Sequence, residues 1–594
     1  MKISIKTLRN IACGISAMAL LHSCTKNLDQ TPESTGTKEA VFGSEDGLKL
    51  YTNSFYNILP DAGTIFRQDC NLSDFGAVTT VPDYIRAGAY SSRQSSGWDW
   101  TALRNINYFI ANCNNPAVSQ SVRENYIGIA RMFRAYFYFE KVKRFGDVPW
   151  YGEPLNVNDT ALLYKGRDPR TVIVDSIVAD LNYATAHITV ADDASRSMVT
   201  KWFAWGLKSR ICLFEGTFRK YQTSYKLQSS ANDFLQMAAD AADSVINSGK
   251  FSINTAGGNL AYRNLFISSS PVASEVMMAN VASASLGKFN DANWYYTSAT
   301  YGSRFNFTRT FINTFLNIDG SAFTDKAGHD TMVFASETKN RDWRLQQMIR
   351  TAGYQRINSG ATFNAPPVFS YTYTGYQPIK WTLDDMYYDA GSLNTNSVSI
   401  MRYAEILLNK AEAKAELGTI TNEDWGKTIG VLRARAGITA GLSSLPTIAD
   451  AYMKTTYFPD INNPVVLEIR RERGIELALE GFRFYDLVRW KHGELLLKQW
   501  TGMYVPALNV PLDLNSDGVL DVCFYQGNAP AKPLSGVTYV NVSADPQKLS
   551  NGTYGELHWL DNVERVWKDN MYLYPIPYAD LQVNPKLGQN PDWQ

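Results

Sequence analysis

The chain has 594 residues, 57 of them Lys or Arg and 57 Asp or Glu, so its formal net charge is zero. This balance gives no electrostatic reason to expect nucleic acid or an anionic membrane surface as a partner. The length allows roughly three or four domains. Aromatic residues make up 13% of the chain, which suits both cores and sugar or peptide surfaces, because Tyr and Trp combine an apolar face with a polar group.

The N-terminus has the pattern of an export signal. Three basic residues precede a short apolar run at 11–21: Lys2, Lys6 and Arg9. The run is about half the roughly 20 residues that a membrane-spanning helix needs. The run closes in the sequence LHSC at 21–24, a bacterial lipoprotein box, so we expect residues 1–23 to be removed and Cys24 to carry lipid. The alternative is an ordinary secretory signal that ends near a cysteine.

Polar residues dominate the stretch that follows, and we predict a flexible tether over 24–40. A first helix is predicted at 44–59. Residues 60–100 are a long irregular segment that carries several aromatic side chains, and such segments are often functional.

Helices are predicted to dominate the next part of the chain. The clearest is 121–145, where apolar residues recur every three or four positions and Gly146 ends the pattern. Further helices are expected at 100–112, 169–187, 200–216 and 231–248. Residues 250–397 are rich in Tyr, Thr, Ser, Asn and Gly, which favours strands, turns and loops. Helices return at 398–417, 422–436 and 464–491, and the chain is loop-rich again from 500.

Consecutive helices of about 15 to 20 residues indicate antiparallel hairpins stacked as a solenoid. The pair at 401–417 and 423–436 has about the length of a tetratricopeptide unit, although the strict pattern of that repeat is missing. The predicted fold is therefore mainly α. Degenerate tetratricopeptide-like hairpins pack against an irregular, loop-rich, ligand-binding part with short strands.

Three ordered groups of residues resemble signatures of the SusD/RagB family. They are RYAE at 402–405 with AEA at 411–413; EIRRER at 468–473 with EL at 476–477, EGFR at 480–483 and DLVRW at 486–490; and YPIP at 574–577 with NPKLGQNP at 584–591. The resemblance divides the chain into an N-terminal SusD-like region at 41–249 and a C-terminal region at 250–594, intertwined as one unit. Since Glu472, Glu476 and Glu480 lie four apart, we interpret the charged cluster at 470–489 as an ion-pair framework along one helix face.

The resemblance implies a function. Members of this family are outer-membrane lipoproteins exposed at the cell surface. They capture oligosaccharides, or peptides in some branches, and deliver them to a TonB-dependent transporter barrel. The resemblance thus predicts a non-catalytic binding protein, anchored through Cys24, with an oligosaccharide ligand and no nucleic-acid partner.

Three aromatic, polar clusters are candidates for sugar binding, because pyranose C–H groups stack on flat rings while hydroxyls need polar partners. They lie at 69–98, 290–305 and 371–381. The predicted contacts are Asp69, Trp98, Trp294, Tyr295, Tyr296, Arg304 and Tyr373. The alternative for each aromatic residue is packing between the helices and the irregular part.

One loop follows the spacing of a calcium site. Its oxygen ligands would be Asp513, Asn515, Asp517, the Val519 carbonyl and Asp521, with Gly518 at the turn. Phe524 stands where an EF-hand needs Glu, so an isolated calcium loop and a plain Asp/Asn turn both remain open.

Enzyme motifs give little support for catalysis. There is no HExxH and no GxSxG, and no cofactor is required. The alternatives are peptide capture for a RagA-type transporter, a surface glycoside hydrolase, whose carboxylate pair cannot be recognised in sequence, and a scaffold with no small ligand.

Overall fold

The computed structural model describes residues 38–593. The predicted signal peptide at 1–23, the lipidation site Cys24 and most of the predicted tether lie outside the described residues. The tether prediction is wrong at its end, since residues 38–40 already belong to helix α2 (Lys38–Phe42). No helix between 38 and 593 has the length and apolar character required to span a bilayer.

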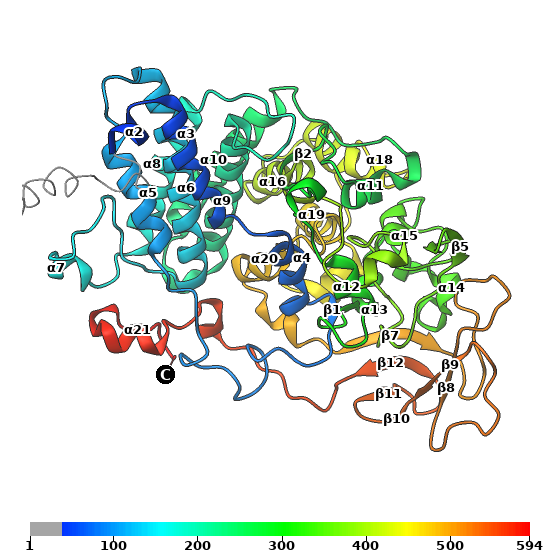
Figure 1. Ribbon diagram of the computed structural model, residues 1–594. Helices are drawn as coiled ribbons and strands as arrows, with labels where there is room; N and C mark the ends of the chain where they lie inside the picture. Colours follow the sequence, from blue (N-terminus) through cyan, green and yellow to red (C-terminus); the bar gives the residue numbers. More distant parts are fainter. Residues whose placement is uncertain (1–37, 594) are drawn as a thin grey trace, which may run out of the picture.

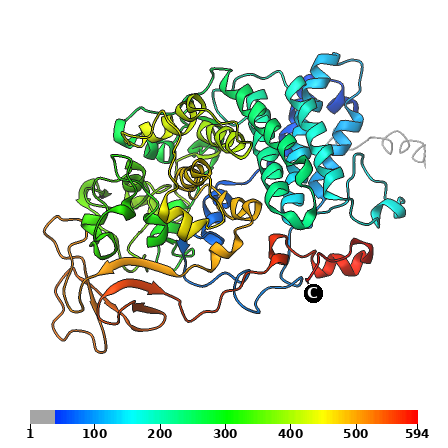
Figure 2. The ribbon, with the colours of Figure 1, turned by 180° about the vertical axis from the view of Figure 1, so that it is seen from behind.

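A layer of long helices forms one side of the molecule (Figure 1). It contains α3 (Glu45–Asn53) with the 3₁₀ turn η1 (Ser54–Ile58), α5 (Thr101–Asn112), α6 (Gln120–Phe145), α8 (Arg170–His187), α9 (Lys201–Tyr221) and α10 (Ala231–Ile246). These bounds agree with the predicted helices to within a few residues. From behind, the layer again lies beside the C-terminal helix α21 (Tyr578–Val583) (Figure 2).

The longest helix, α6, shows why the sequence folds this way. Ser119 caps its start by accepting a hydrogen bond from the Val122 amide. Gly146 ends it with φ of +76°, and a Cβ there would lie 2.6 Å from Leu573. Only glycine meets both the backbone and the packing requirement at this position.

Helix α16 (Tyr403–Glu416) extends the stack by packing on α10 and on α19 (Pro464–Glu476). Two predicted helices are wrong in part. Residues 398–402 form strand β6 (Val398–Arg402), which pairs antiparallel with β2 (Val276–Asn280). The strand is fully buried, so its backbone amides need hydrogen-bond partners, and β2 supplies them.

The predicted helix 464–491 is divided into α19 and α20 (Arg483–Trp490). Leu479 and Gly481 between them have φ of +61° and +84°, which a helix cannot accommodate. The helix predicted at 422–436 is present but irregular, as α17 (Asn422–Trp425), a π-helical turn (Gly426–Gly430) and α18 (Val431–Arg435).

The other side of the molecule holds shorter elements, as predicted. They include α4 (Ala62–Asn71), α11 (Ala261–Ile267), α12 (Ala292–Thr297), α13 (Arg309–Ile312), α14 (Phe334–Glu337) and α15 (Trp343–Met348). The antiparallel sheet at its lower edge has the order β10 (Ser543–Ala544), β11 (Gln547–Leu549), β12 (Gly555–Trp559), β7 (Trp500–Val505). This side also contains three separate two-stranded sheets. They are β1 (Gly76–Ala77) with β3 (Asn306–Phe307), β4 (Gln355–Asn358) with β5 (Ala361–Asn364), and β8 (Val522–Tyr525) with β9 (Thr538–Asn541).

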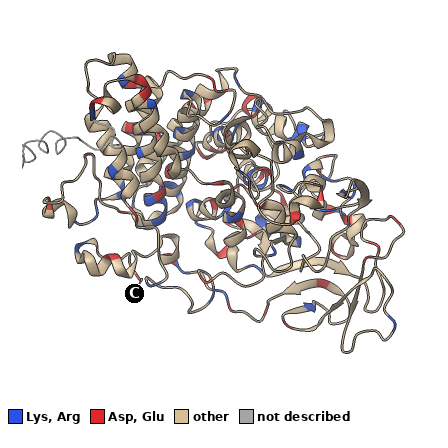
Figure 3. Ribbon diagram, in the orientation of Figure 1, with Lys and Arg blue, Asp and Glu red and all other residues tan. Residues whose placement is uncertain are grey.

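The two sides share one large hydrophobic cluster, which includes Phe42 and Leu587 from near the two ends of the described chain. The segment before α5 and the C-terminal segment also meet directly. Tyr84 stacks on Tyr574 with ring centroids 4.3 Å apart, and its hydroxyl donates to the Met571 carbonyl at 2.7 Å. Basic and acidic residues are interspersed along the helices of both sides (Figure 3).

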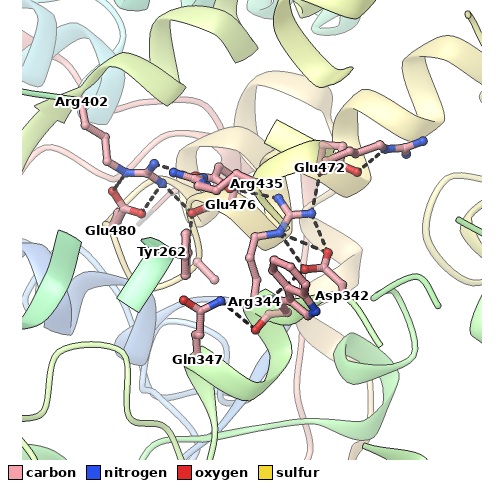
Figure 4. A network of polar contacts seen from close by, with 12 residues as sticks. Tyr262, Asp342, Arg344, Gln347, Arg402, Arg435, Glu472, Glu476 and Glu480 are labelled. Carbon is pink, nitrogen blue, oxygen red and sulfur yellow. Dashed lines mark hydrogen bonds and ion pairs between the residues drawn. The ribbon is translucent and has the colours of Figure 1, made fainter. Parts of the chain in front are cut away.

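The charged signature residues form a buried framework where α15, β6, α18 and α19 meet (Figure 4). Glu476 accepts hydrogen bonds from Arg402 at 2.6 Å and Arg344 at 3.0 Å, and from Arg435. Burial by itself would raise the pKa of Glu476, but the three guanidinium groups hold it well below its usual range.

The same pattern continues on either side of Glu476. Glu472 accepts from Arg344 at 2.9 Å and Arg433 at 2.6 Å, and Glu480 accepts from Arg402 and Lys380. The ion pairs thus join separate segments and do not run along one helix. The predicted framework is present, but its predicted geometry is wrong, because α19 ends at Glu476 and presents its carboxylates to neighbouring elements.

Candidate functional site

A stacked pair of aromatic rings lies at the start of the irregular part. Trp294 in α12 stacks on Tyr301, with ring centroids 3.6 Å and planes 12° apart. Both side chains are half-buried, so part of each ring meets solvent. Such a pair presents a flat apolar surface of the kind on which sugar rings stack.

Polar groups hold this pair in place. The Tyr301 hydroxyl donates to Asp291 at 2.6 Å, and this hydrogen bond is the main reason why the pKa of Tyr301 is raised. Arg67 of α4 forms an ion pair with Asp291 and donates to the Tyr301 hydroxyl at 3.3 Å. Its guanidinium also lies over the ring of Tyr295, 4.9 Å from the centroid. The ring pair is therefore fixed, with a neutralised charge pair beside it.

A second stacked pair lies nearby in the fold. Tyr373 stacks on Trp559 of β12, with centroids 3.7 Å and planes 12° apart. The two side chains are only 8% and 9% exposed, so their faces are used in packing. The Tyr373 hydroxyl accepts a hydrogen bond from Arg304 at 3.0 Å. The predicted ligand contact Tyr373 is thus buried, and its hydroxyl binds Arg304.

The segment 298–304 joins the two pairs. The Tyr295 and Ser303 hydroxyls lie 2.8 Å apart, and the Ser303 carbonyl accepts from the Thr79 amide at 2.8 Å. Gly302 has φ of +75°, and a Cβ there would lie 2.7 Å from Tyr295. We call Arg67, Trp294, Tyr301 and Arg304 the aromatic site.

Besides Tyr373, three more predicted contacts are buried. Asp69 is fully buried, and its carboxylate accepts hydrogen bonds from the amides of Gly481 and Arg483 at the start of α20. Tyr295 and Tyr296 are 6% and 3% exposed, and the Tyr296 hydroxyl donates to the Phe66 carbonyl at 2.7 Å. Their burial corrects the prediction that these side chains face a ligand, since they pack α12 against α4.

Trp98 lies apart from the aromatic site. It is half-buried and makes edge contacts with Trp100 and Phe145. Its neighbours Gly97 and Asp99 line a cavity of about 860 Å³ between α3, η1, α5 and α6. Adjoining cavities of about 330 and 260 Å³ share Glu140 with it.

The concave region beside Trp98 is charged. Lys141 donates to the Gly97 carbonyl at 2.5 Å, and burial lowers its pKa to about 8. No contact that we observe within residues 38–593 joins Trp98 to the aromatic site, so the structure does not bring all the predicted residues together.

The predicted calcium loop is closed by its own amides. The Asp513 carboxylate accepts from the amides of Ser516 at 2.7 Å and Gly518 at 2.8 Å, and Asp517 accepts from Val519 at 2.9 Å. Burial, followed by the charges of Asp513 and Asp517, raises the pKa of Asp521 to about 6. In the described part of the chain, no three His, Cys, Asp or Glu side chains are grouped to hold a metal. This absence concerns only those four residue types, whereas the expected ligand set also includes the Asn515 side chain and the Val519 carbonyl. Calcium binding therefore stays a prediction.

Comparison with known proteins decides the family. Residues 273–593, more than half of the chain, match the model described as the SusD family. The chain belongs to the SusD family. Residues 45–210 also match a model of the SusD-like class described as starch-binding and associating with the outer membrane. The resemblance found in the signature residues is confirmed.

Relatives of this SusD-family chain match along most of its length. It is 22% identical to the SusD-like protein P25 of Formosa agariphila over 522 residues, covering 81% of this chain and 90% of that protein. A crystal structure of a SusD-like protein from Bacteroides fragilis superposes with a TM-score of 0.66 at 21% identity, covering 93% and 98% of the two chains. A second structure from that species, described as a SusD-like carbohydrate-binding protein, gives 0.66 at 19% identity, covering 92% and 100%. The predicted fold class is confirmed.

Several residues of the aromatic site were missed in the sequence. Arg67 gives no signal, since its pairing with Asp291 depends on α4 and α12 meeting in the fold. Asp291 and Tyr301 lie inside the predicted cluster 290–305 but were not among the predicted contacts. Trp559 could not be predicted from the sequence, since it reaches Tyr373 only through the sheet.

Proposed function

We propose that this protein captures oligosaccharides at the cell surface without cleaving them and delivers them to a TonB-dependent transporter in the outer membrane. The observation that carries the proposal is the stacked, half-exposed pair Trp294 and Tyr301, held by Asp291 and Arg67. A flat ring surface beside polar groups is what a pyranose needs, because it has an apolar C–H face and hydroxyls at its edge.

Membership of the SusD family supports this reading, as does the solved relative described as carbohydrate-binding. The LHSC sequence at 21–24 and the matched description of outer-membrane association support a lipid anchor at Cys24. The transporter as partner is an expectation from the family. A passive role is favoured by the absence of common catalytic motifs from the sequence.

Calorimetric titration of the protein without its first 24 residues against a panel of oligosaccharides tests capture. We expect binding to at least one glycan class and no release of reducing sugar on incubation. Binding to peptides and to no glycan would replace this proposal with peptide capture. Release of reducing sugar would show a glycoside hydrolase.

A further inference from the structure

Arg304 is an arginine for which the described residues supply no acidic partner, and it lies in the same short segment as Tyr301. Its Nε donates to the Ala299 carbonyl at 2.8 Å and its Nη1 to the Tyr373 hydroxyl at 3.0 Å. Both acceptors are neutral. Within residues 38–593 Arg304 forms no ion pair, and its Nη2 has no protein acceptor, although this atom is not buried. The guanidinium therefore has no carboxylate beside it in the described chain, and at least one of its donors is free.

Several other buried arginines are neutralised, whereas Arg341 and Arg350 donate only to backbone carbonyls. Arg67, on the same site, is paired with Asp291. In the framework, Arg344 and Arg402 are each surrounded by carboxylates. Because Arg67 and Asp291 cancel, Arg304 gives the aromatic site a net positive charge.

The backbone holds Arg304 in a fixed position. Its φ is +46°, in the left-handed region that few residues other than glycine adopt. The Asn306 side chain donates to the Arg304 carbonyl at 2.6 Å, and Thr79 donates to the preceding carbonyl, that of Ser303, through its amide and its hydroxyl. Strained residues that are held by several partners gather at ligand sites, where they orient a side chain in advance.

We infer that the bound oligosaccharide carries an anionic group, a carboxylate or a sulfate ester, and that Arg304 binds it. This inference rests on the proposed function and specifies its ligand class. The free guanidinium N–H can donate a charge-assisted hydrogen bond to such an anion, and a bond of this kind is about twice as strong as a neutral one. The Arg304 guanidinium is hydrogen-bonded to Ala299, two positions before Tyr301, so the proposed sugar would lie on the ring pair and extend a substituent along this segment to the guanidinium.

Tyr373 is a positioning residue in this scheme. Its ring lies beneath the guanidinium, 5.5 Å from the centroid, and its hydroxyl accepts from Nη1. Stacking on Trp559 fixes the ring in turn. Because the side chain is already ordered, Nη2 can bind the ligand with little further loss of conformational entropy.

The test is titration with oligosaccharides of one backbone and length in three forms: neutral, uronate-containing and sulfated. We expect one acidic form to bind at least about tenfold more tightly than the neutral form, which is the effect of one charge-assisted hydrogen bond. The form that binds identifies the anion. Raising the salt concentration should reduce this preference, because it screens the charge.

Three variants assign the preference to Arg304. In Arg304→Gln the ratio of acidic to neutral affinity should fall to about one, and in Tyr373→Phe, which keeps the ring, it should fall several-fold. Arg93→Gln is the matched control, since Arg93 also lies over a tyrosine, Tyr578 at 4.2 Å, outside the site. The control should keep the full ratio.

Equal binding of all three forms by the unaltered protein would overturn the inference, as would a ratio that survives in Arg304→Gln. In both cases oligosaccharide capture would stand. If none of the forms binds, and no other glycan does, the proposed function itself fails. Thermal unfolding of each variant confirms that a changed ratio does not arise from a misfolded protein.

Discussion

The hydroxyl of Tyr301 donates a 2.6 Å hydrogen bond to Asp291, and this bond fixes the ring on which Trp294 stacks. The two rings and Asp291 belong to one short stretch of chain, around α12, and Arg67 of α4 adds a contact from a distant element. Truncating the exposed part of either ring should therefore affect ligand binding more than folding.

Trp294→Ala should weaken oligosaccharide binding by roughly two- to tenfold, because a ring contact contributes about 0.5–1.5 kcal/mol. Calorimetric titration measures the loss. Trp205→Ala, at another half-buried tryptophan in α9, is the matched control and should leave the affinity unchanged. An equal loss in both variants would mean that the effect comes from general destabilisation.

Trp98→Ala should reduce affinity less than Trp294→Ala. Trp98 packs on Trp100 and Phe145 beside a different cavity, and no observed contact in the described chain connects it with the aromatic site. The same titration decides the matter. A loss as large as that of Trp294→Ala would extend the site to the cavity around Glu140.

Arg402→Met should lower the free energy of unfolding by about 3–5 kcal/mol, since it leaves the buried carboxylates of Glu476 and Glu480 short of a partner. Urea unfolding followed by tryptophan fluorescence measures the change. Lys427→Met removes an exposed pair with Glu423 and should have no measurable effect. Similar unfolding curves for the two variants would contradict a structural role for the framework.

The buried carboxyl of Asp69 should make stability depend on pH. Burial raises its pKa from 3.8 to about 7, despite the hydrogen bonds from Gly481 and Arg483. Between pH 4 and 7 the folded protein holds a proton that the unfolded chain has released, so stability falls as pH rises through this range, by up to about 1.4 kcal/mol per pH unit. Asp69→Asn should remove this slope in urea unfolding series. A slope that is the same in both proteins would refute the assignment.

Calcium should bind the loop 513–521, and Asp517→Ala should abolish the heat of binding in calorimetry. Because the pKa of Asp521 is raised to about 6, protons compete with calcium below that pH, and the affinity should decrease from pH 7 to pH 5. Asp83→Ala, at an exposed aspartate elsewhere, is the control. No heat with the unaltered protein at millimolar calcium would leave the loop as an Asp/Asn turn held by its own amides.

The helices could be predicted because their signal is local. Apolar spacing and the stop at Gly146 define α6, and the same reasoning gives most of the helical layer. Strand β6 was not predictable in this way, because Val398–Arg402 is extended only where β2 pairs with it. The break between α19 and α20 depends on Asp69, more than 400 positions away, accepting the amides of Gly481 and Arg483.

The candidate site could be predicted only in part, for the same reason. Trp294 and Arg304 lie in a segment whose composition marks it, and both side chains are partly exposed. Burial decided the rest: Tyr295 and Tyr296 follow Trp294 directly but point into the core. Residue type indicates which side chains can stack on sugar, whereas exposure depends on how α12 packs against α4.

The charge framework of Figure 4 has a consequence for synthesis. The buried carboxylate of Glu275 pairs with Arg402 and Arg435, so a ribosome makes the acid more than 120 residues before its first base. Until that base arrives, the nascent chain carries an unbalanced charge that cannot enter a core. The interior of the C-terminal half is thus expected to close late, when Glu472 to Glu480 complete the set.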